Sequence, residues 1–433
     1  MGGLTGTASA IGLVQTDSYT LDFNLEVGAG LFHSGVDYSG QDRGNVDWQE
    51  GYFKGGLTGN YLFPNQRGSF YGGLSAIGSG TWGDGDAGGF TTGDERKFDL
   101  EDAFLGWKSG KLVGGVDDAI DFSGGRQKYV LGDGFLINGD SLNLGDGLGS
   151  RFNRGGAYWL APRKAFKKTA IARIQTGTPL HADLFYLGSG NPGQGYTELA
   201  GVNFEYVDET YGALGASYFK VTDVNTELLD GYFALRDNLQ TYNIRGQGSA
   251  GLENTVFSFG YAHQRGNEDI KVDADAWYLE GAYTFAQWAW SPSFTYRYSS
   301  FSGDDPSTSK SEAFDPLFYG FNSYGTWYQG EVAANYAGPF NSNVKVHHVA
   351  LKAQPLEQLG LGALYFKYIS DEPAPGVDSD FAQEVDLYAE WIVNEHLYVS
   401  PLLGIYIPGD GAEALYGNDD TNYYFQLVAV LTY

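Results

Sequence analysis

Basic side chains gather in one part of an otherwise acidic chain. The 433 residues hold 26 Lys and Arg against 53 Asp and Glu, for a formal net charge of −27. Charged rings select ions in pores, and the field of a narrow passage can outweigh distant surface charge of opposite sign. The basic side chains therefore predict a constriction that selects anions. Its candidate members are Arg126, Lys128, Arg151, Arg154, Arg163, Lys164, Lys168, Arg173, Arg245 and Arg297.

Salt bridges within the wall are the alternative interpretation of these basic residues. Asp133, Asp140 and Asp146 lie in the same stretch and could neutralise them. Glu384 and Asp386 are acidic candidates for the pore lining, because they share the polar face of a predicted strand. Both interpretations stay open at the level of sequence.

Other reactive chemistry finds little support in the sequence. The chain has no Cys, which removes thiolate metal sites and Cys nucleophiles. None of the six His has a metal-binding spacing such as HExxH, and the adjacent His347 and His348 would face opposite ways in a strand. No Gly-x-Ser-x-Gly motif is present. We therefore predict no catalytic residues, no metal site and no enzyme activity.

Acidic, glycine-rich loops recur at residues 83–86, 145–147, 303–305, 409–411 and 418–420. Calcium needs several oxygens that converge on one point, and none of these loops has the spacing of an EF-hand. The turn preferences of Asp and Gly account for most of them. Calcium in one loop is a secondary expectation, and no other cofactor is expected.

The charge also limits the partners. A phosphate binder needs a basic surface, so the net charge of −27 argues against nucleic acid. Acidic loops outside a membrane would suit a lipopolysaccharide surface bridged by divalent cations. Solubility alone is the alternative explanation of the charge.

The elements that position these residues are predicted to be β-strands in which apolar and polar side chains alternate. In residues 421–433, Tyr423, Phe425, Leu427 and alternate residues up to the final Tyr433 share one face. A strand that ends the chain on an aromatic residue resembles the closing strand of outer-membrane barrels, although the edge strand of a soluble sandwich is the alternative. No run approaches the roughly 18 apolar residues of a membrane helix, whereas the strands of a membrane barrel alternate.

Eighteen such strands are predicted, joined by short turns and long loops in alternation. Their even number, with every long loop at one end, predicts an up-and-down antiparallel transmembrane β-barrel that forms one domain over residues 1–433. Residues 131–167 and 303–341 are long loops expected to constrict the lumen. Residues 1–18 are left without a strand, and Met1-Gly2-Gly3 is interpreted as a mature or recombinant start because no signal peptide is visible. The predicted strands are 20–32, 48–62, 68–82, 97–108, 119–130, 168–175, 180–188, 196–207, 211–221, 240–248, 254–264, 274–286, 291–301, 342–353, 360–370, 380–393, 396–408 and 421–433.

The two faces of these strands indicate a wet interior. Arg245 and Arg297 lie on polar faces, and aromatic residues such as Trp48 and Trp391 lie near strand ends, as in the aromatic girdles of barrels. Alternation alone places Arg126 on the face of Phe122. A bulge near Gly124-Gly125 is therefore required to turn Arg126 inward.

Several short motifs resemble those of alginate-export-type outer-membrane porins. They are Gly125-Arg126-Gln127, Gly132-Asp133-Gly134-Phe135-Leu136-Ile137, Ala182-Asp183-Leu184-Phe185-Tyr186-Leu187, Gln383-Glu384-Val385-Asp386-Leu387-Tyr388 and Ile407-Pro408-Gly409. The resemblance implies a monomeric eighteen-stranded barrel, and the family's namesake exports an anionic polysaccharide through an Arg-rich lumen. This chain departs from that pattern because inward acids rival its inward bases, which argues against alginate itself as the solute. Related porins pass small organic acids or sugars.

These observations predict an integral protein of the bacterial outer membrane, a monomer in contact with the lipid bilayer and lipopolysaccharide. Its predicted function is passive passage of small or polymeric anionic or neutral solutes, such as saccharides, uronates and organic acids. The alternative function is a plugged barrel that acts as a scaffold for a periplasmic or surface partner.

Overall fold

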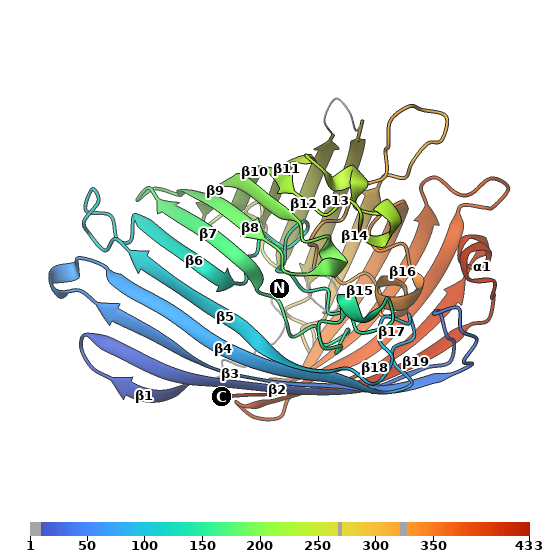
Figure 1. The fold of residues 1–433 in the computed structure, drawn as a ribbon, viewed down its shortest axis with the longest axis horizontal. Helices are drawn as coiled ribbons and strands as arrows, with labels where there is room; N and C mark the ends of the chain where they lie inside the picture. Colours follow the sequence, from blue (N-terminus) through green and yellow to red (C-terminus); the bar gives the residue numbers. More distant parts are fainter. Residues whose placement is uncertain (1–9, 267–270, 321–326) are drawn as a thin grey trace.

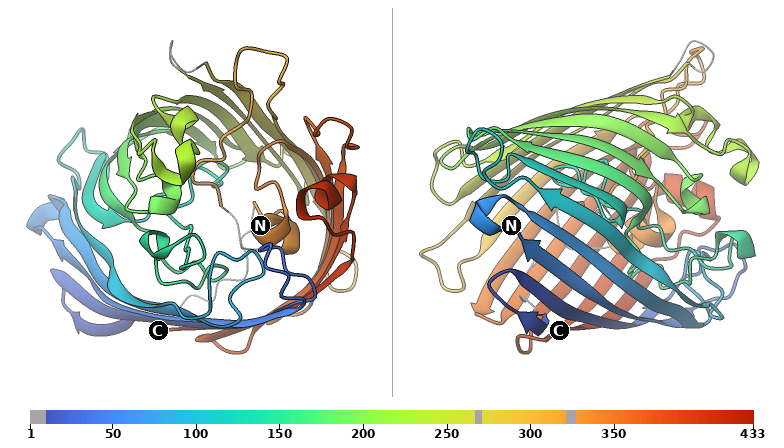
Figure 2. Two further views of the ribbon diagram at one scale, coloured as in Figure 1. Left: turned by 45° about the vertical axis from the view of Figure 1, so that its right-hand side comes forward. Right: turned by 60° about the vertical axis from the view of Figure 1, so that its left-hand side comes forward.

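The computed structural model describes residues 10–266, 271–320 and 327–433. Within these residues the strands form one antiparallel sheet that closes on itself (Figures 1 and 2). Each strand from β2 onwards pairs with its neighbours in sequence, and β19 pairs with β2 from Tyr424 opposite Ser34 to Thr432 opposite Glu26. The described strands β2 to β19 thus make an eighteen-stranded barrel, as predicted.

The strands of the wall correspond one to one with the eighteen predicted segments. Their bounds are β2 (Tyr19–Ser34), β3 (Val46–Leu62), β4 (Ser69–Gly83), β5 (Arg96–Lys108), β6 (Ile120–Gln127), β7 (Phe166–Gln175), β8 (Leu180–Gly188), β9 (Glu198–Asp208), β10 (Gly212–Asp223), β11 (Gln240–Gly248), β12 (Thr255–Arg265), β13 (Asp273–Thr284), β14 (Ser293–Phe301), β15 (Val344–Leu356), β16 (Leu359–Ser370), β17 (Asp380–Ile392), β18 (Leu397–Pro408) and β19 (Asn422–Thr432).

One further strand, β1 (Ile11–Gln15), was not predicted. It pairs with residues 20–23 of β2, on the same edge that β19 occupies from residue 26 onwards. β1 therefore lengthens the wall beside the end of β19 without adding a crossing. Its five residues are too few to show a clear alternation in the sequence.

The helical elements are short and lie in the connections. They are η1 (Pro64–Gln66), η2 (Ser150–Phe152), η3 (Pro192–Gln194), η4 (Leu228–Gly231), η5 (Ala234–Arg236), the π-helical turn η6 (Ala333–Ala337) and α1 (Asp410–Tyr416). In the described part of the chain, no helix combines the length and apolar character needed to cross a bilayer.

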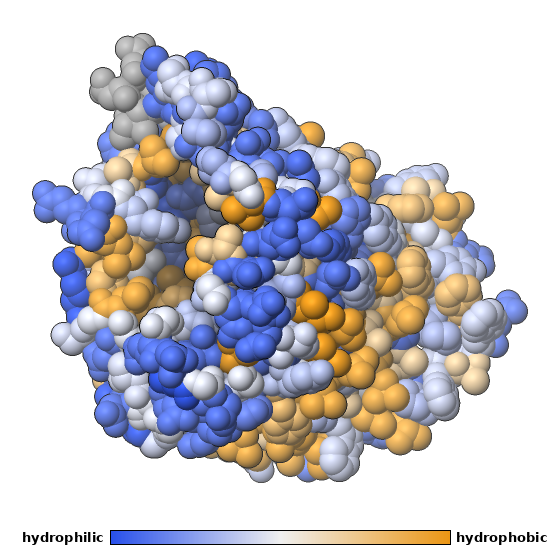
Figure 3. Space-filling model, turned by 90° about the vertical axis from the view of Figure 1, so that its right-hand side faces the viewer, coloured by the Kyte–Doolittle hydropathy of each residue, from blue (hydrophilic) through white to orange (hydrophobic). Residues whose placement is uncertain are grey.

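Alternation along the strands gives the barrel an apolar outside and a polar inside. Leu31 and Phe53 are 53% and 50% exposed on the outer face, whereas Gln426 and Asn422 on the inner face of β19 are buried. Outward apolar side chains face lipid in a barrel of this kind. Figure 3 views the end with the long loops, where hydrophilic residues crowd the mouth and apolar residues gather on the flank.

The buried core lies inside the barrel rather than between two sheets. Two connections fold inward and fill much of the lumen: lumen loop 1 (residues 128–165, between β6 and β7) and lumen loop 2 (residues 302–320 and 327–343, between β14 and β15). Figure 2 shows loop 1 in teal and the later part of loop 2, with η6, in orange within the ring of strands, whereas the first part of loop 2 extends beyond the ring. The described residues confirm that the predicted loops, residues 131–167 and 303–341, fold into the lumen; residues 321–326 of the second lie outside the described residues, and constriction of the passage stays a prediction.

Candidate lumen constriction

Lumen loops 1 and 2 are joined by main-chain hydrogen bonds. Ile137 and Phe318 form a parallel bridge, in which Phe318 N donates to Leu136 O at 3.0 Å and Asn138 N donates to Phe318 O at 2.7 Å. Gly320 N adds a bond to Gly134 O at 3.0 Å. Because each loop satisfies polar main-chain groups of the other, the two act as one body across the lumen.

Aromatic packing reinforces the contact between the loops. Phe135 of loop 1 stacks on Trp327 of loop 2 with ring centroids 4.6 Å apart, and both rings contact Tyr278 of the wall. Phe318 meets Phe166 of β7 edge-on at 5.0 Å. Aromatic pairs of this geometry contribute about 0.5–1.5 kcal/mol each beyond the area they bury.

Two carboxylates of β17 hold loop 2 against the wall. Glu384 accepts the main-chain N–H groups of Val332 and Ala333 at 2.7 and 2.9 Å. Asp386 accepts Glu331 N at 3.2 Å and the Tyr328 hydroxyl at 3.1 Å. Glu384 and Asp386 do face inward, but both are 0% exposed beneath the loop. The prediction that they line the passage is therefore wrong, because the loop they bind covers them.

Arg297 of β14 has the same anchoring role. Its guanidinium donates to Tyr328 O and to the Gln329 side chain, both at 2.9 Å, and lies over the Trp327 ring at 4.8 Å. Its side chain is also within 3.7 Å of Glu280. Since Arg297 is 1% exposed, it holds loop 2 and does not line an open passage, contrary to the prediction.

Loop 1 is held by a similar exchange between charged side chains and main-chain groups. Arg154 donates to Asp140 O at 2.6 Å and pairs with the Asp140 carboxylate at 3.5 Å. Arg163 is buried and donates to Lys97 O at 3.0 Å and to Ser79 Oγ at 3.2 Å. Arg154 and Arg163 are thus engaged in fixing the loop, which is the structural role weighed in the sequence analysis.

Inward acids of β3 and β5 complete the anchoring of loop 1, and these residues were not singled out from the sequence. Glu50 accepts Trp159 N at 3.1 Å and Leu160 N at 2.9 Å. Glu101 accepts Lys164 N at 2.7 Å and Ala165 N at 2.8 Å. Glu50 lies on the same face of its strand as Trp48 and Tyr52, so the sequence alone could have indicated that it faces inward. The sequence could not show its partners, because they belong to loop 1, about 110 residues further along the chain.

The remaining basic candidates are spread over the barrel. Arg245 on β11 bonds to Glu205 and, at 2.8 Å, to Asn203. Arg173 on β7 lies 3.8 Å from Asp121. Arg151 of η2 is exposed and lies 5.5 Å from the Phe152 ring. The structure therefore does not bring all the predicted basic residues into one ring.

Arg126 lies at a register shift between β6 and β7. The register between β6 and β7 shifts between Gly125 and Gln127, and Gly125 has φ +125°, a conformation that favours glycine. A Cβ on Gly125 would come within 2.3 Å of Ala103 O. Arg126 Nε donates to Glu101 O at 2.9 Å, beside loop 1. The extra residue of this shift lies on β7, between Phe166 and Thr169, and the β5–β6 register is unbroken through Ala103 and Arg126, so the inward turn of Arg126 stays a prediction.

Lys128 and Lys164 of loop 1 are basic candidates without a carboxylate partner, a feature they share in the described residues with Arg126, Arg151 and Arg163, which contact main-chain or hydroxyl oxygens or a ring. No carboxylate of the described residues lies within 4.0 Å of either ammonium group, whereas Lys54 close by pairs with Asp102 at 2.7 Å. Burial, and after it repulsion from Lys164 and Lys54, lowers the pKa of Lys128 to about 8. Burial likewise lowers the pKa of Lys164, with Glu26 opposing that shift. Lys128 and Lys164 thus add positive charge to loop 1 without a direct ion pair among the described residues, although Glu26 and Glu101 lie near enough to Lys164 to favour its charged form.

The family model for alginate export matches residues 200–424, a little over half of the chain. The chain belongs to the alginate export family. The match covers the wall from β9 to β19, including Glu384 and Asp386. No curated protein matches the chain.

Solved outer-membrane channels share the fold. A BenF-like porin from Pseudomonas fluorescens Pf-5 has a TM-score of 0.61 at 11% identity, over 95% of this chain and 98% of that one. OccAB2 of Acinetobacter baumannii has a TM-score of 0.59 at 13% identity, over 95% of this chain and 98% of that one. OccD3 (OpdP) of Pseudomonas aeruginosa has a TM-score of 0.57 at 13% identity, over 99% of this chain and 94% of that one. This member of the alginate export family is an integral outer-membrane protein, and its family and fold are those of channels.

Proposed function

We propose that the protein is a passive channel for anionic or neutral solutes, with a preference for small solutes that bear carboxylates, such as uronates and organic acids. The observation that supports it is the pair Lys128 and Lys164, whose charges are not balanced by a carboxylate within 4.0 Å in the described residues. A passing anion would provide the missing counter-charge. Neutral saccharides would pass without that attraction.

The neighbouring charges favour this assignment. Arg154 pairs with Asp140, Arg245 with Glu205, and Lys54 with Asp102, so these groups add little net field at the passage. An unpaired ammonium in a partly desolvated wall acts at a lower effective dielectric than one in bulk water. Two such groups on one loop can therefore select anions although the whole chain is acidic.

The same proposal includes a monomeric barrel without catalytic activity, whose acidic outer loops lie toward lipopolysaccharide. Diffusion through the lumen needs no chemical step and no cofactor. The secondary expectation of loop calcium stays a prediction. Asp86, in one of the acidic loops, already accepts the N–H groups of Gly88 and Thr91 at 2.9 and 2.6 Å.

The test is the reversal potential of reconstituted protein in a planar bilayer under a KCl gradient. Lys128→Gln and Lys164→Gln should each reduce anion preference, and the double variant should reduce it most. Lys168→Gln is the matched control, because Lys168 is an exposed lysine paired with Glu198 at 2.8 Å outside the lumen. An unchanged reversal potential in the double variant would remove both lysines from the selectivity mechanism.

A plugged barrel that serves as a scaffold is the second candidate function. The observation that favours it is the continuous contact of loops 1 and 2 through Ile137 and Phe318 and through Phe135 and Trp327. In this case the intact barrel would give no conductance steps. Release of loop 2 by a variant would then be needed before any current is seen.

A further inference from the structure

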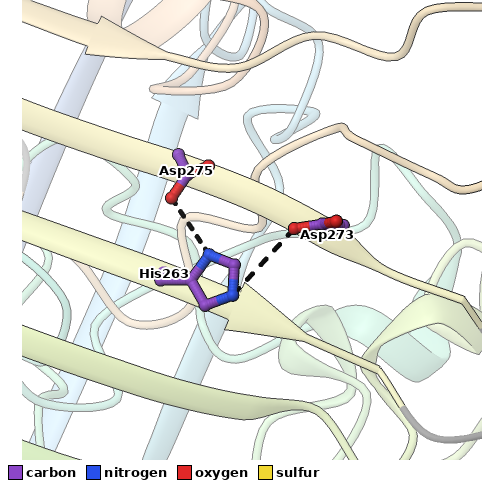
Figure 4. A group of neighbouring side chains, drawn as sticks. All are labelled: His263, Asp273 and Asp275. Atoms are coloured by element: carbon purple, nitrogen blue, oxygen red, sulfur yellow. Dashed lines mark hydrogen bonds and ion pairs between the residues drawn. The ribbon is translucent and has the colours of Figure 1, made fainter.

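Three potential metal ligands meet on the outer face of the barrel (Figure 4). His263 of β12 lies directly opposite Asp275 of β13 in the antiparallel ladder, and Asp273 lies two pairs further along on the same face, opposite Arg265. Side chains directly opposite each other are close neighbours, and diagonal ones are within reach of long side chains. Regular strand pairing therefore places one imidazole between two carboxylates.

Asp275 fixes the orientation of the imidazole. Its Oδ1 lies 3.0 Å from His263 Nδ1 and accepts a hydrogen bond from the Tyr261 hydroxyl at 2.5 Å. A carboxylate can only accept, so the proton of a neutral imidazole is on Nδ1 and the lone pair is on Nε2. A carboxylate that accepts from one ring nitrogen commonly supports a histidine whose other nitrogen binds a metal.

Asp273 offers an oxygen in front of that lone pair. Its Oδ1 lies 4.0 Å from His263 Nε2, while its other oxygen, Oδ2, pairs with the Lys310 ammonium. In a tetrahedral site, zinc bonds of about 2.0–2.1 Å hold the nitrogen and the oxygen about 3.4 Å apart, so the observed 4.0 Å is longer than in a formed site. A small rotation of the carboxylate would shorten the gap to that of a tetrahedral site. Lys310 leaves Oδ1 available, so its ion pair and a bound metal are compatible.

We propose that His263 Nε2 and Asp273 Oδ1 bind a divalent ion of the zinc type on the outer rim of the barrel. Asp275 supports the imidazole, and water fills the other positions. Mixed nitrogen and oxygen ligands suit Zn²⁺ better than Ca²⁺ or Mg²⁺, which prefer oxygen alone. The competing explanation is a protonated His263 held by two ion pairs, which needs no metal.

A bound ion would also brace loop 2. Asp273 N donates to Ser311 O at 3.0 Å, and Val272 forms a parallel bridge with Ser311. Lys310 and Ser311 belong to the outer part of loop 2. A metal bound to Asp273 would therefore stabilise the start of β13, to which this part of loop 2 is hydrogen-bonded.

Calorimetric titration of the whole, tag-free protein in detergent with Zn²⁺ tests the proposal. We expect one saturable site per chain, lost in His263→Ala and in Asp273→Asn. Asp275→Asn should bind about 10–100-fold more weakly, as for other residues that orient a ligand. His33→Ala is the matched control, because outward His33 faces Asp47 at 2.8 Å in the same direct pairing, with no diagonal carboxylate at metal-binding distance among the described residues.

Two results would overturn the proposal. One is the absence of a saturable Zn²⁺ site in wild type, which would leave the protonated ion-pair explanation. The other is equal loss of binding in His33→Ala and His263→Ala, which would indicate general histidine binding. A band shift on heating before electrophoresis checks that each variant retains the barrel.

Discussion

Ile137 and Phe318, from two different loops, pair as a parallel β-bridge inside the barrel. A bridge of this kind fixes two loops that could otherwise move separately, and Phe318 also packs on Phe166 of the wall. The width of the passage is therefore set by loops 1 and 2 together. Changes at the anchors of either loop should alter conductance while the wall of strands persists.

The strongest anchor of loop 2 is the Glu384 carboxylate. Glu384→Ala should leave the N–H groups of Val332 and Ala333 without their acceptor, at a cost of about 1–3 kcal/mol per buried group. We expect loop 2 to detach more often, with larger and noisier single-channel steps and faster amide exchange in residues 327–337. Glu390→Ala, on the same face of β17, is the control. Identical conductance in the two variants would contradict the anchoring role.

Trp327 is the centre of the aromatic contact between the loops. It is 3% exposed and contacts Phe135, Tyr278 and the Arg297 guanidinium. Trp327→Ala should destabilise loop docking by about 3–5 kcal/mol, since a large buried ring is lost. Conductance should rise while the far-ultraviolet circular dichroism stays that of a barrel. Outward Trp391→Ala, on lipid-facing β17, should leave conductance unchanged.

The charge of Lys128 gives the channel a pH dependence. With a pKa of about 8, Lys128 is mostly protonated at pH 7 and mostly neutral at pH 9. Anion preference should therefore decrease as the pH rises through 8, as seen in reversal potentials measured at several pH values. Lys128→Gln should abolish this part of the dependence. A preference that increases with pH would contradict the assignment.

Glu331 of loop 2 should make loop docking sensitive to pH. Burial, and after it the charge of Glu384, raises the pKa of Glu331 from its ordinary value near 4.5 to about 8. The docked loop binds this proton more tightly than the released loop, so docking weakens as the pH rises from about 4.5 to 8 and changes little above. The facing groups are Glu384, Asp386 and the Tyr328 hydroxyl, which bonds to Glu331 at 3.0 Å.

Single-channel recordings between pH 5 and 9 check this expectation. Open events should become more frequent toward pH 8 in wild type and should lose that trend in Glu331→Gln. The combined variant Lys128→Gln and Glu331→Gln separates gating from selectivity, because the first residue acts on reversal potential and the second on open time. A trend that persists in Glu331→Gln would assign it to another group.

The wall was predictable because each strand carries its own signal. The alternation of Tyr423, Phe425 and Leu427 with buried Tyr424 and Gln426 is local, and the closed barrel follows from repeating it eighteen times. β1 was not predicted, because a strand of five residues shows little alternation between apolar and polar side chains. The register shift beside Arg126 was not predicted in the right strand, because its extra residue lies on β7 and not at Gly124-Gly125.

The interior was less predictable because its contacts join residues distant in sequence. Alternation showed that Glu384, Asp386 and Arg297 face inward, but only the position of loop 2 shows that they are covered. The same limit applies to His263 and Asp273. Their approach depends on the register of β12 and β13, which the sequence leaves uncertain by a few residues.

The most direct test of the channel itself is the current through wild-type protein in a planar bilayer. We predict ohmic single-channel steps and, under a KCl gradient at pH 7, a reversal potential of the sign that reports chloride permeating faster than potassium. A folded barrel without steps, or one that favours potassium, would contradict the account of an anion-preferring passage past Lys128 and Lys164.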